Sequence, residues 1–350
     1  MSEYEEKKRS SRGCGFGCLI MLAVGFGMIA AVVALVWFGV ASGNIEGDFG
    51  TSFMGASADG HGEDEFPDMI EKWSTGSGTT KVVRIPVSGM IMLSHTAWAE
   101  RNAVMALRSI RRATLDPQVK ALILEVNSGG GGITASDIIY KALKNFKAAQ
   151  DGRVIVTIMG DVAASGAYYI SLPSDYILAH PTTVTGSIGV IMQSYNIKDL
   201  AAKIGIKDVT VKSGANKDFF NPMHDVKPEQ MAIMQRVISR MHDRFVTLVS
   251  NDRKLDKGVV GKLADGRVYL ADEAVRNGLI DGLGYYQDAV VKAAELLKTP
   301  SVKVFRYEEQ LTLSDFFGGG GPGIGMQLKR MITGEHSGSG LMYLWQPAGE

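Results

Sequence analysis

The chain contains one stretch of apolar residues long enough to cross a membrane. No charged residue occurs from Gly13 to Ile45, and the apolar run "CLIMLAVGFGMIAAVVALVWFGVA" within it exceeds the roughly 20 residues that a transmembrane helix needs. A cleaved signal peptide has a shorter apolar core, of about 7 to 15 residues. The pattern therefore predicts an uncleaved transmembrane helix at residues 14–41.

Beyond residue 80, short apolar runs alternate with amphipathic stretches. Runs such as "KALILEV" and "RVIVTIM" are rich in Val, Leu and Ile. Runs of this kind that alternate with helices are typical of βα units and of a largely parallel sheet buried on both faces. An α/β fold follows, with strands predicted at 81–87, 120–126, 153–159, 175–180, 185–192 and 208–212, helices at 97–113, 134–149 and 227–251, and a final strand and helix within 267–284.

The segments on either side of this pattern do not share it. Residues 42–79 are rich in Gly, Ser and acidic residues and lack apolar periodicity, which is typical of a linker. Residues 306–350 include "GGGGPGIG" and are predicted to form a flexible tail. The chain is thus divided into a head at 1–13, the membrane helix, the linker, one folded domain at 80–305 and the tail.

Charge on the two sides of the apolar segment predicts its orientation. Lys7, Lys8, Arg9 and Arg12 precede it, whereas the region after it is acidic as far as Glu71. Positively charged flanks stay in the cytoplasm. The head is therefore predicted to be cytoplasmic, and the folded domain to lie on the other side of the cell membrane in a single-pass protein.

The composition limits the classes of function. The chain has 37 basic and 37 acidic residues in 350, so it has no net positive charge that would favour nucleic acid. Its two cysteines, Cys14 and Cys18, lie inside the apolar segment and supply neither a disulfide framework nor the ligands of a zinc site. Chemistry must therefore come from local groups of side chains.

A glycine-rich loop follows the predicted strand 120–126. The sequence "NSGGGGITASD" leads from that strand into a helix, and its glycines let a ligand approach the backbone N–H groups. Gly130, Gly132 and Ala135 also fit a dinucleotide-binding fingerprint. This fingerprint requires an acidic residue at the end of the next strand, about 20 residues after the glycines. The acidic residue at that place is Asp161, which comes about 30 residues after them. A plain turn and an oxyanion hole are the other interpretations.

A single serine follows the next predicted strand. In "GDVAASGAYYIS", Ser165 stands among small residues, and its hydroxyl should lie near the glycine loop because parallel strands end at the same sheet edge. A hydroxyl needs a base before it can act as a nucleophile. His180, oriented by Asp175 or Asp208, would complete a Ser-His-Asp triad, and Lys217 in "SGANKDFFNP" would serve if burial and its neighbours lowered its pKa. Spacing alone leaves both bases open.

Five motifs in a fixed order carry a resemblance to a known family. They are "NSGGGG", "GDVAASGAYYIS", "TGSIGVIM", "VKSGANKD" and "GRVYLADEAVRNGLIDGLG". From about residue 80 to residue 300, the chain resembles the signal peptide peptidase A (SppA) family of membrane-bound serine proteases, peptidase family S49, in its short single-domain form.

The resemblance implies a ClpP/crotonase-like α/β spiral fold and a Ser-Lys dyad. In this chain Ser165 is then the nucleophile and Lys217 the general base, while Ser187 in "TGSIG" hydrogen-bonds and orients the lysine amine. The implied oxyanion hole consists of the backbone N–H groups of Gly131 and Gly166. This chemistry requires no metal ion and no organic cofactor.

Two residues depart from the family's usual motifs. Gly129 replaces a proline after the Asn-Ser pair, and Ala167 replaces a second glycine after the serine. A glycine in place of a proline leaves the backbone torsion φ less restricted. The change predicts a less rigid oxyanion loop and does not alter the identity of the dyad.

The resemblance also implies substrates and partners. The family cleaves apolar peptides such as signal peptide remnants in or beside the lipid bilayer, and its short members resemble ring-forming homo-oligomers in which neighbouring subunits can supply the serine and the lysine. The single serine motif and single lysine motif of this chain fit a homo-oligomer. The alternatives are an inactive membrane scaffold of the same fold, a hydrolase that uses His180, and a crotonase-type acyl-CoA enzyme.

Overall fold

The computed structural model describes residues 69–93, 101–309 and 342–344. The chain separates into two compact units, Met1–Gly60 and His61–Glu350, and all the described elements belong to the second. The predicted membrane helix at 14–41 lies outside the described residues. Within them, no helix combines the length and the apolar character that a membrane crossing requires.

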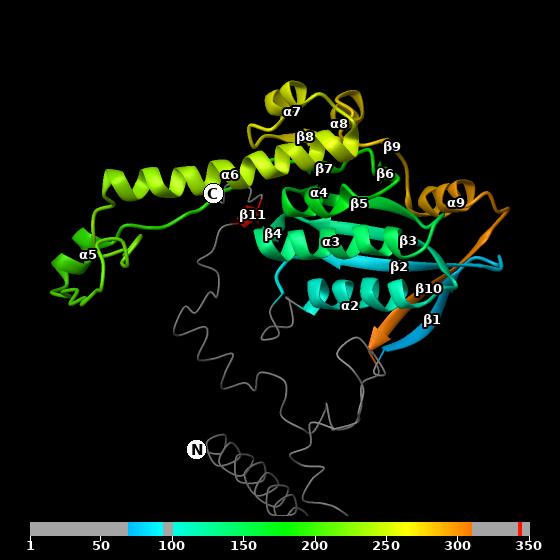
Figure 1. The fold of residues 1–350 in the computed structure, drawn as a ribbon, viewed down its shortest axis with the longest axis horizontal. Helices are drawn as coiled ribbons and strands as arrows, with labels where there is room; N and C mark the ends of the chain where they lie inside the picture. Colours follow the sequence, from blue (N-terminus) through cyan, green and yellow to red (C-terminus); the bar gives the residue numbers. More distant parts are fainter. Residues whose placement is uncertain (1–68, 94–100, 310–341, 345–350) are drawn as a thin grey trace, which may run out of the picture. The chain divides into compact units, whose positions relative to one another are not determined.

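A nine-stranded sheet forms the centre of the described part of the chain (Figure 1). Its order is β1-β10-β2-β3-β5-β6-β9, with β7 paired to the end of β5 and β8 paired to β7. All these pairs are parallel except those of β1 with β10 and of β7 with β8. The strands are β1 (Met69–Thr75), β2 (Thr80–Ser88), β3 (Val119–Ser128), β5 (Val154–Ala164), β6 (Tyr176–Ala179), β7 (Val184–Gly186), β8 (Val268–Leu270), β9 (Gly282–Leu283) and β10 (Val302–Glu309).

Strand β3 shows why the apolar runs form the centre of this sheet. Leu122 and Leu124 are buried in one hydrophobic core, and Ala121 and Ile123 are buried in the other. Successive side chains of a strand point to opposite faces, so burial on both faces requires a continuous apolar run. The α/β class predicted from these runs is confirmed.

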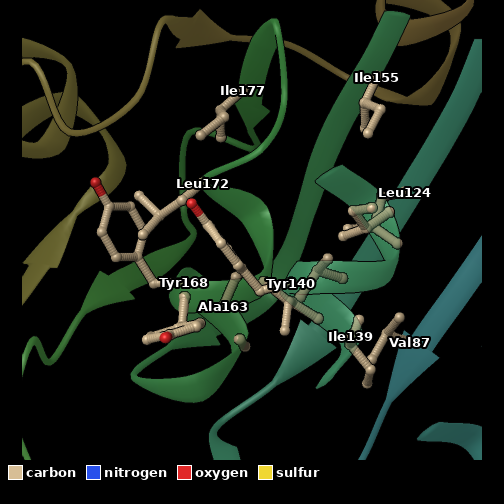
Figure 2. Packing of buried hydrophobic residues seen from close by; sticks show 14 of the residues in the cluster. Val87, Leu124, Ile139, Tyr140, Ile155, Ala163, Tyr168, Leu172 and Ile177 are labelled. Atoms are coloured by element: carbon tan, nitrogen blue, oxygen red, sulfur yellow. The ribbon is translucent and has the colours of Figure 1, made fainter. Parts of the chain in front are cut away.

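Helices contribute to both cores. The larger core contains residues of α2, α3, α4 and α6, whereas the smaller one contains three alanines of α9. Figure 2 shows part of the larger core, where Tyr140 of α3 and Tyr168 of α4 lie among aliphatic side chains. The helices are α2 (Arg101–Leu115), α3 (Ile133–Ala149), α4 (Gly166–Ser171), α5 (Lys198–Lys203), α6 (Pro228–Arg253), α7 (Lys257–Leu263), α8 (Ala271–Arg276) and α9 (Tyr286–Leu296).

Two predicted strands differ from the structure. The run 185–192 belongs to a strand only as far as Gly186, and the run 208–212 forms no strand. In the second run Val209 and Val211 are 89% and 98% exposed. An alternating apolar pattern forms a strand only where other elements pair with it and cover it, and none of the described elements does so here. The first run ends in an arm, defined here as residues 189–227, and the second lies inside it. The arm contains α5 and leads into α6.

Three strands extend the domain beyond the segment from 80 to 305. β1 comes from the end of the stretch interpreted as a linker, and β10 continues to Glu309. A third strand, β11 (Met342–Leu344), comes from the stretch interpreted as a tail and pairs antiparallel with β4 (Gly130–Gly132) in a separate two-stranded sheet. All three strands form because they pair with segments that are distant in the sequence, and the local pattern does not reveal such pairing.

Candidate active site

Strand β5 changes its neighbour just before the predicted nucleophile. Its residues Val156–Met159 pair with β6, whereas Val162–Ala164 pair with β7. On its other side it pairs with β3, and this register shifts before Ser128 pairs with Ala163. The carboxyl ends of β3, β5 and β7 therefore meet at one sheet edge, which is where parallel sheets bind ligands.

Two serines with an unusual backbone conformation lie at this edge. Ala164 of β5 pairs with Gly186 of β7, so the residues that follow them, Ser165 and Ser187, leave the sheet side by side. Both serines have positive φ, 56° and 50°, and are only 1% and 6% exposed. Such a conformation in a residue other than glycine costs about 1–3 kcal/mol and is concentrated at functional sites. The structure therefore brings two of the predicted site residues together.

Hydrogen bonds on both sides hold the backbone of Ser165. Its N–H donates to the carbonyl of Gly186 at 2.8 Å, and its carbonyl accepts from the N–H of Tyr169 at 2.9 Å. Ser165 is the N-cap residue of α4, and Gly166 is the first residue of that helix. The first N–H groups of a helix lack an intrahelical acceptor, so the N–H of Gly166 lies next to the serine with its donor capacity unused by the helix. A sharp strand-to-helix turn of this kind presents the nucleophile in other serine hydrolases.

The glycine loop forms the short strand β4 between two extended segments. The N–H of Ile91 donates to the carbonyl of Gly130, and the N–H of Gly132 donates to the carbonyl of Ile91, each at 2.9 Å. Backbone groups alternate along a strand, so the N–H of Gly131 points to the opposite side, where β11 pairs. A Cβ atom at Gly131 would lie 2.3 Å from the carbonyl oxygen of Ile91, so this position requires glycine.

Two residues that the sequence analysis missed restrain this loop. The N–H of Gly130 donates to Oγ of the buried Ser128 at 3.0 Å, and Oδ1 of Asn127 accepts from the N–H of Val162 at 3.1 Å. The two side chains thus hold the loop to itself and to β5. These bonds oppose the flexibility that Gly129 was predicted to introduce. An Asn-Ser pair at the end of a strand, whose side chains commonly bond to nearby backbone, is the signal that could have identified them.

The predicted base does not lie with the two serines in this chain. Lys217 is exposed in the arm, where its backbone N–H donates to the carbonyl of Gly214 at 3.1 Å. Among the described residues, its side chain makes no hydrogen bond to Ser165. Figure 1 shows α5, which belongs to the same arm, beyond the end of the sheet. The described residues of its own chain do not supply the burial that a lysine base needs.

The alternative base, His180, is also separated from Ser165 by the strand order. It follows β6, which pairs with the first part of β5, and its ring packs on that of Tyr285 with the centroids 5.2 Å apart. Asp175 precedes β6 at the opposite edge of the sheet, where its carboxylate accepts from the N–H of Ile155 at 2.8 Å. The fold therefore places β7, and not His180, beside the predicted nucleophile, Ser165.

A cavity of about 260 Å³ lies in the arm beside the loop that carries Lys217. Its lining includes Lys212, Asp218 and His224, and Nζ of Lys212 donates to Oδ2 of Asp218 at 2.5 Å. These contacts fix the turn next to Lys217. Within the described ranges, no group of three or more His, Cys, Asp or Glu residues could hold a metal ion.

Comparison with known proteins identifies the family. Residues 147–299 match the model of peptidase family S49. A putative signal peptide peptidase SppA from Enterococcus faecium is 35% identical over 298 residues, which cover 83% of this chain and 83% of that protein. The chain belongs to peptidase family S49. The resemblance drawn from the five motifs is thereby confirmed, and the S49 match includes Ser165, Ser187 and Lys217.

Membership of family S49 makes the chain a serine-type peptidase. Protease 4 from Salmonella typhi is 40% identical over 206 residues, which are 59% of this chain but 33% of that longer protein. A ClpP1 mutant from Listeria monocytogenes superposes with a TM-score of 0.38 at 16% identity, over 60% of this chain and 94% of that one. A score at this level does not establish a shared architecture, so the ClpP/crotonase-like spiral stays a prediction.

Proposed function

We propose that the chain is a membrane-anchored serine endopeptidase whose nucleophile is Ser165 and whose general base is Lys217 of a second copy. The serine oxygen bonds to a peptide carbonyl carbon while its proton passes to the neutral lysine amine. The amine returns the proton to the leaving nitrogen, and water then hydrolyses the acyl-enzyme. The buried, positive-φ Ser165 next to Ser187 is the observation that carries the proposal.

The backbone donors near Ser165 fit the charge that develops in this reaction. The N–H of Gly166 belongs to the residue after the nucleophile, and the N–H of Gly131 points to the side of β4 on which Met342–Leu344 pairs. Donors fixed before the reaction stabilise a tetrahedral oxyanion strongly, since they do not have to reorganise. In the proposed mechanism Ser187 accepts or donates a hydrogen bond at the incoming lysine amine and orients it toward Ser165.

The arm supports assembly into a homo-oligomer. Lys217 is exposed in its own chain, and a catalytic lysine requires burial before its amine is neutral at working pH. The arm also exposes many large apolar side chains, a pattern typical of a surface that binds another protein. These side chains belong to Ile191, Tyr195, Ile197, Leu200, Ile204, Ile206, Val209 and Val211. A second copy that received the arm would bury these side chains and bring Lys217 to a Ser165 site.

The proposed substrates are apolar peptides such as signal peptide remnants. One relative carries the name signal peptide peptidase SppA. The outer edge of β4 pairs with an antiparallel strand, Met342–Leu344, so an extended peptide that took the place of this strand would meet the same backbone groups. The predicted anchor at 14–41 would hold the site close to peptides left in the bilayer. Removal of residues 1–41 should release the protein from the membrane fraction, and retention there would reject the anchor.

Replacement of the nucleophile tests the reaction. The Ser165→Ala variant should lose at least about a thousandfold in the rate of cleavage of a fluorogenic apolar peptide. A serine-directed phosphonate should label Ser165 in the wild-type chain, as shown by mass spectrometry of its peptides. Full activity in Ser165→Ala would assign the reaction to another site, and a wild-type chain without activity would favour the inactive fold.

Mixing of variants tests the base and the assembly together. Lys217→Ala should be inactive and His180→Ala active, because the strand order directs β7 rather than His180 to the nucleophile. Co-expression of Ser165→Ala with Lys217→Ala should restore about a quarter of the wild-type rate, since random neighbours then form some complete sites. No recovery would confine the dyad to one chain, and an active Lys217→Ala variant would reject the lysine.

A further inference from the structure

Asp137 joins three elements that surround the nucleophile. Oη of Tyr169 in α4 donates to Oδ1 of Asp137 in α3 at 2.6 Å. The guanidinium of Arg244 in α6 donates to the same oxygen, from Nη2 at 2.5 Å and from Nε at 3.3 Å. Helix α3 begins directly after the glycine strand, and α4 begins directly after Ser165. One carboxylate therefore connects the helix of the nucleophile to the helix of the predicted oxyanion loop.

The ring of Tyr169 is fixed among other aromatic rings. Tyr169 is completely buried, and its ring lies 5.4 Å from that of Tyr140 in a T-shaped contact and 5.0 Å from that of Phe245. Ring pairs at these separations are mutually stabilising. The phenol hydroxyl is thereby aimed at Asp137, while the backbone N–H of the same residue donates to the carbonyl of Ser165 at 2.9 Å.

The backbone of Ser165 needs support of this kind. Its φ of 56° is unfavourable for a serine and persists only where the surroundings hold it. Helix α4 has six residues, and so short a helix has little stability of its own. A bond between its first turn and the glycine strand would therefore keep the serine in place relative to Gly131. The bond between Tyr169 and Asp137 ties that turn to α3 and so to the glycine strand.

Arg244 keeps Asp137 suited to this role. The hydrogen bond with Asp137 raises the pKa of Arg244 above its usual value, so the guanidinium stays charged beside the carboxylate. An ionised carboxylate accepts a shorter and stronger hydrogen bond from a phenol than a neutral group does. The side chains of Asp137 and Arg244 are 38% and 55% exposed, so both can be replaced without opening the core.

We propose that Tyr169 is a positioning residue for the peptidase reaction, and that Asp137, paired with Arg244, holds it. The phenol does not touch the reacting atoms. It fixes the first turn of α4, so that Ser165 Oγ and the N–H of Gly166 keep their place relative to Gly131. The inference rests on the proposed role of Ser165 as nucleophile. It adds a residue whose loss should slow the chemical step without weakening the binding of a peptide.

A matched pair of variants tests the inference. Tyr169→Phe removes the hydroxyl that bonds to Asp137, and Tyr168→Phe removes a hydroxyl from the adjacent residue, which is equally buried but donates to the backbone carbonyl of Leu279 at 2.8 Å. Tyr169→Phe in the full chain should lower kcat about tenfold with KM unchanged, because small displacements of a reacting group are costly. Tyr168→Phe should keep kcat within about twofold of the wild type while losing similar stability.

Variants of the acceptor supply a second arm. Asp137→Asn keeps an oxygen that can accept from the phenol and should retain most of the kcat, whereas Asp137→Ala should lose as much as Tyr169→Phe. Equal kcat values for Tyr169→Phe and Tyr168→Phe, or for Asp137→Ala and wild type, would overturn the inference and leave the hydroxyl a purely structural group.

Hydrogen exchange separates this inference from the proposed function. The backbone N–H of Tyr169 should exchange at least about tenfold faster in Tyr169→Phe than in Tyr168→Phe, because its acceptor is the carbonyl of the displaced Ser165. This measurement does not depend on catalysis. An inactive wild-type chain would reject the proposed function, whereas unchanged exchange in Tyr169→Phe would reject the positioning role by itself.

Discussion

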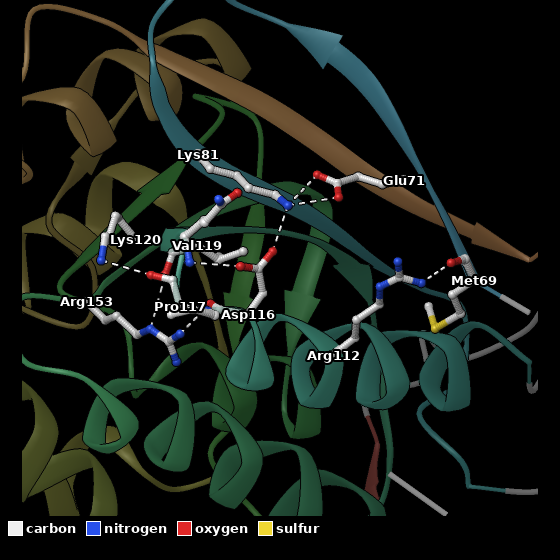
Figure 3. A network of polar contacts seen from close by, with 10 residues as sticks. Met69, Glu71, Lys81, Arg112, Asp116, Pro117, Val119, Lys120 and Arg153 are labelled. Carbon is white, nitrogen blue, oxygen red and sulfur yellow. Dashed lines mark hydrogen bonds and ion pairs between the residues drawn. The ribbon is translucent and has the colours of Figure 1, made fainter. Parts of the chain in front are cut away.

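The two edges of the sheet hold their polar groups in different ways. At the amino edge Arg153 is 5% exposed and donates to four backbone carbonyls. At the carboxyl edge the buried Ser165 and Ser187 keep an unfavourable φ. Figure 3 shows the amino edge, where Lys81 bonds to both Glu71 and Asp116. The charged groups at the amino edge bond to other groups of the same chain, and these bonds hold the first residues of the strands in place.

The carboxyl edge is built differently. There the N–H of Gly131 points toward the separate strand Met342–Leu344, and Ser165 and Ser187 turn away from the sheet. Polar groups that are satisfied internally stabilise a fold, whereas groups held in costly conformations cluster where ligands react. The same sheet therefore carries a network of satisfied polar groups at one edge and the proposed nucleophile at the other. This difference predicts that substitutions at the two edges affect different measurements.

The largest expected effect belongs to Gly131. Its replacement by alanine places a Cβ atom 2.3 Å from the carbonyl oxygen of Ile91, so β4 must shift and its N–H must leave the site. We expect a loss of about 10²- to 10³-fold in kcat, which is typical for one oxyanion donor. Steady-state cleavage of an apolar peptide measures it.

The control for this prediction is the adjacent glycine. At Gly132 the nearest atoms to a new Cβ lie 3.7 Å and 3.8 Å away, and its φ of −61° suits any residue. Gly132→Ala should therefore stay within a few-fold of wild-type activity. Equal losses of kcat in the two variants would show that the loop tolerates no side chain at either position. The N–H of Gly131 would then have no separate role in the reaction.

At the amino edge, Arg153→Met should reduce stability instead of activity. The change removes a donor from four backbone carbonyls, of which those of Val119 and Phe146 are buried. We expect the free energy of unfolding to fall by about 3 kcal/mol. Urea unfolding measures the change, and kcat of the folded fraction should be preserved. A large fall in kcat with intact stability would contradict the separation of the two edges.

Ser187→Ala should have a smaller effect at the carboxyl edge. In the proposed mechanism its hydroxyl orients the lysine amine, so the loss of this hydroxyl should lower kcat about tenfold and shift the rise of kcat with pH, since the amine must be neutral. Ser171→Ala is the control, because that buried hydroxyl donates to the carbonyl of Ala167 within α4. If both variants slow the reaction equally with no shift in the pH profile, Ser187 has no role at the lysine.

The smallest effect concerns pH at the amino edge. Burial acts to raise the pKa of Asp116, but hydrogen bonds from Lys81 and from the N–H of Gln118 outweigh it and leave the pKa below 3.8. A pKa lowered by folding adds stability above the unfolded value, and this contribution is lost as pH falls through the folded value. The stability difference between wild type and Asp116→Asn should therefore be constant from pH 5 to neutral pH and shrink toward pH 3, as urea unfolding at each pH would show. A difference that persists at pH 3 would assign the effect to packing.

The sequence predicted the centre of the fold because β3 and β5 are buried on both faces and must be apolar throughout. It did not predict β4, since a run of glycines has low strand propensity and forms a strand only because Ile91 and Met342–Leu344 pair with it. It predicted a strand around Val209 and Val211, because the local pattern does not show whether another chain element covers it.

For the candidate site, the motifs led to Ser165, Ser187 and Gly131, which the structure places at one edge. They could not show that Lys217 lies in a separate arm, because motif order says nothing about distance in space. The link from Tyr169 to Asp137 was also missed. These residues are 32 positions apart, and neither stands out locally as more than a core tyrosine or a solvated acid.

The positive φ of Ser165 and Ser187 has a consequence for directed evolution. Glycine would adopt both conformations at lower cost than serine, so folding and reactivity favour different residues at these two positions. A library selected only for thermal resistance should enrich glycine at both. A library selected for turnover should retain serine at position 165, and the contrast between the two sequence profiles would mark the site without any substrate being known.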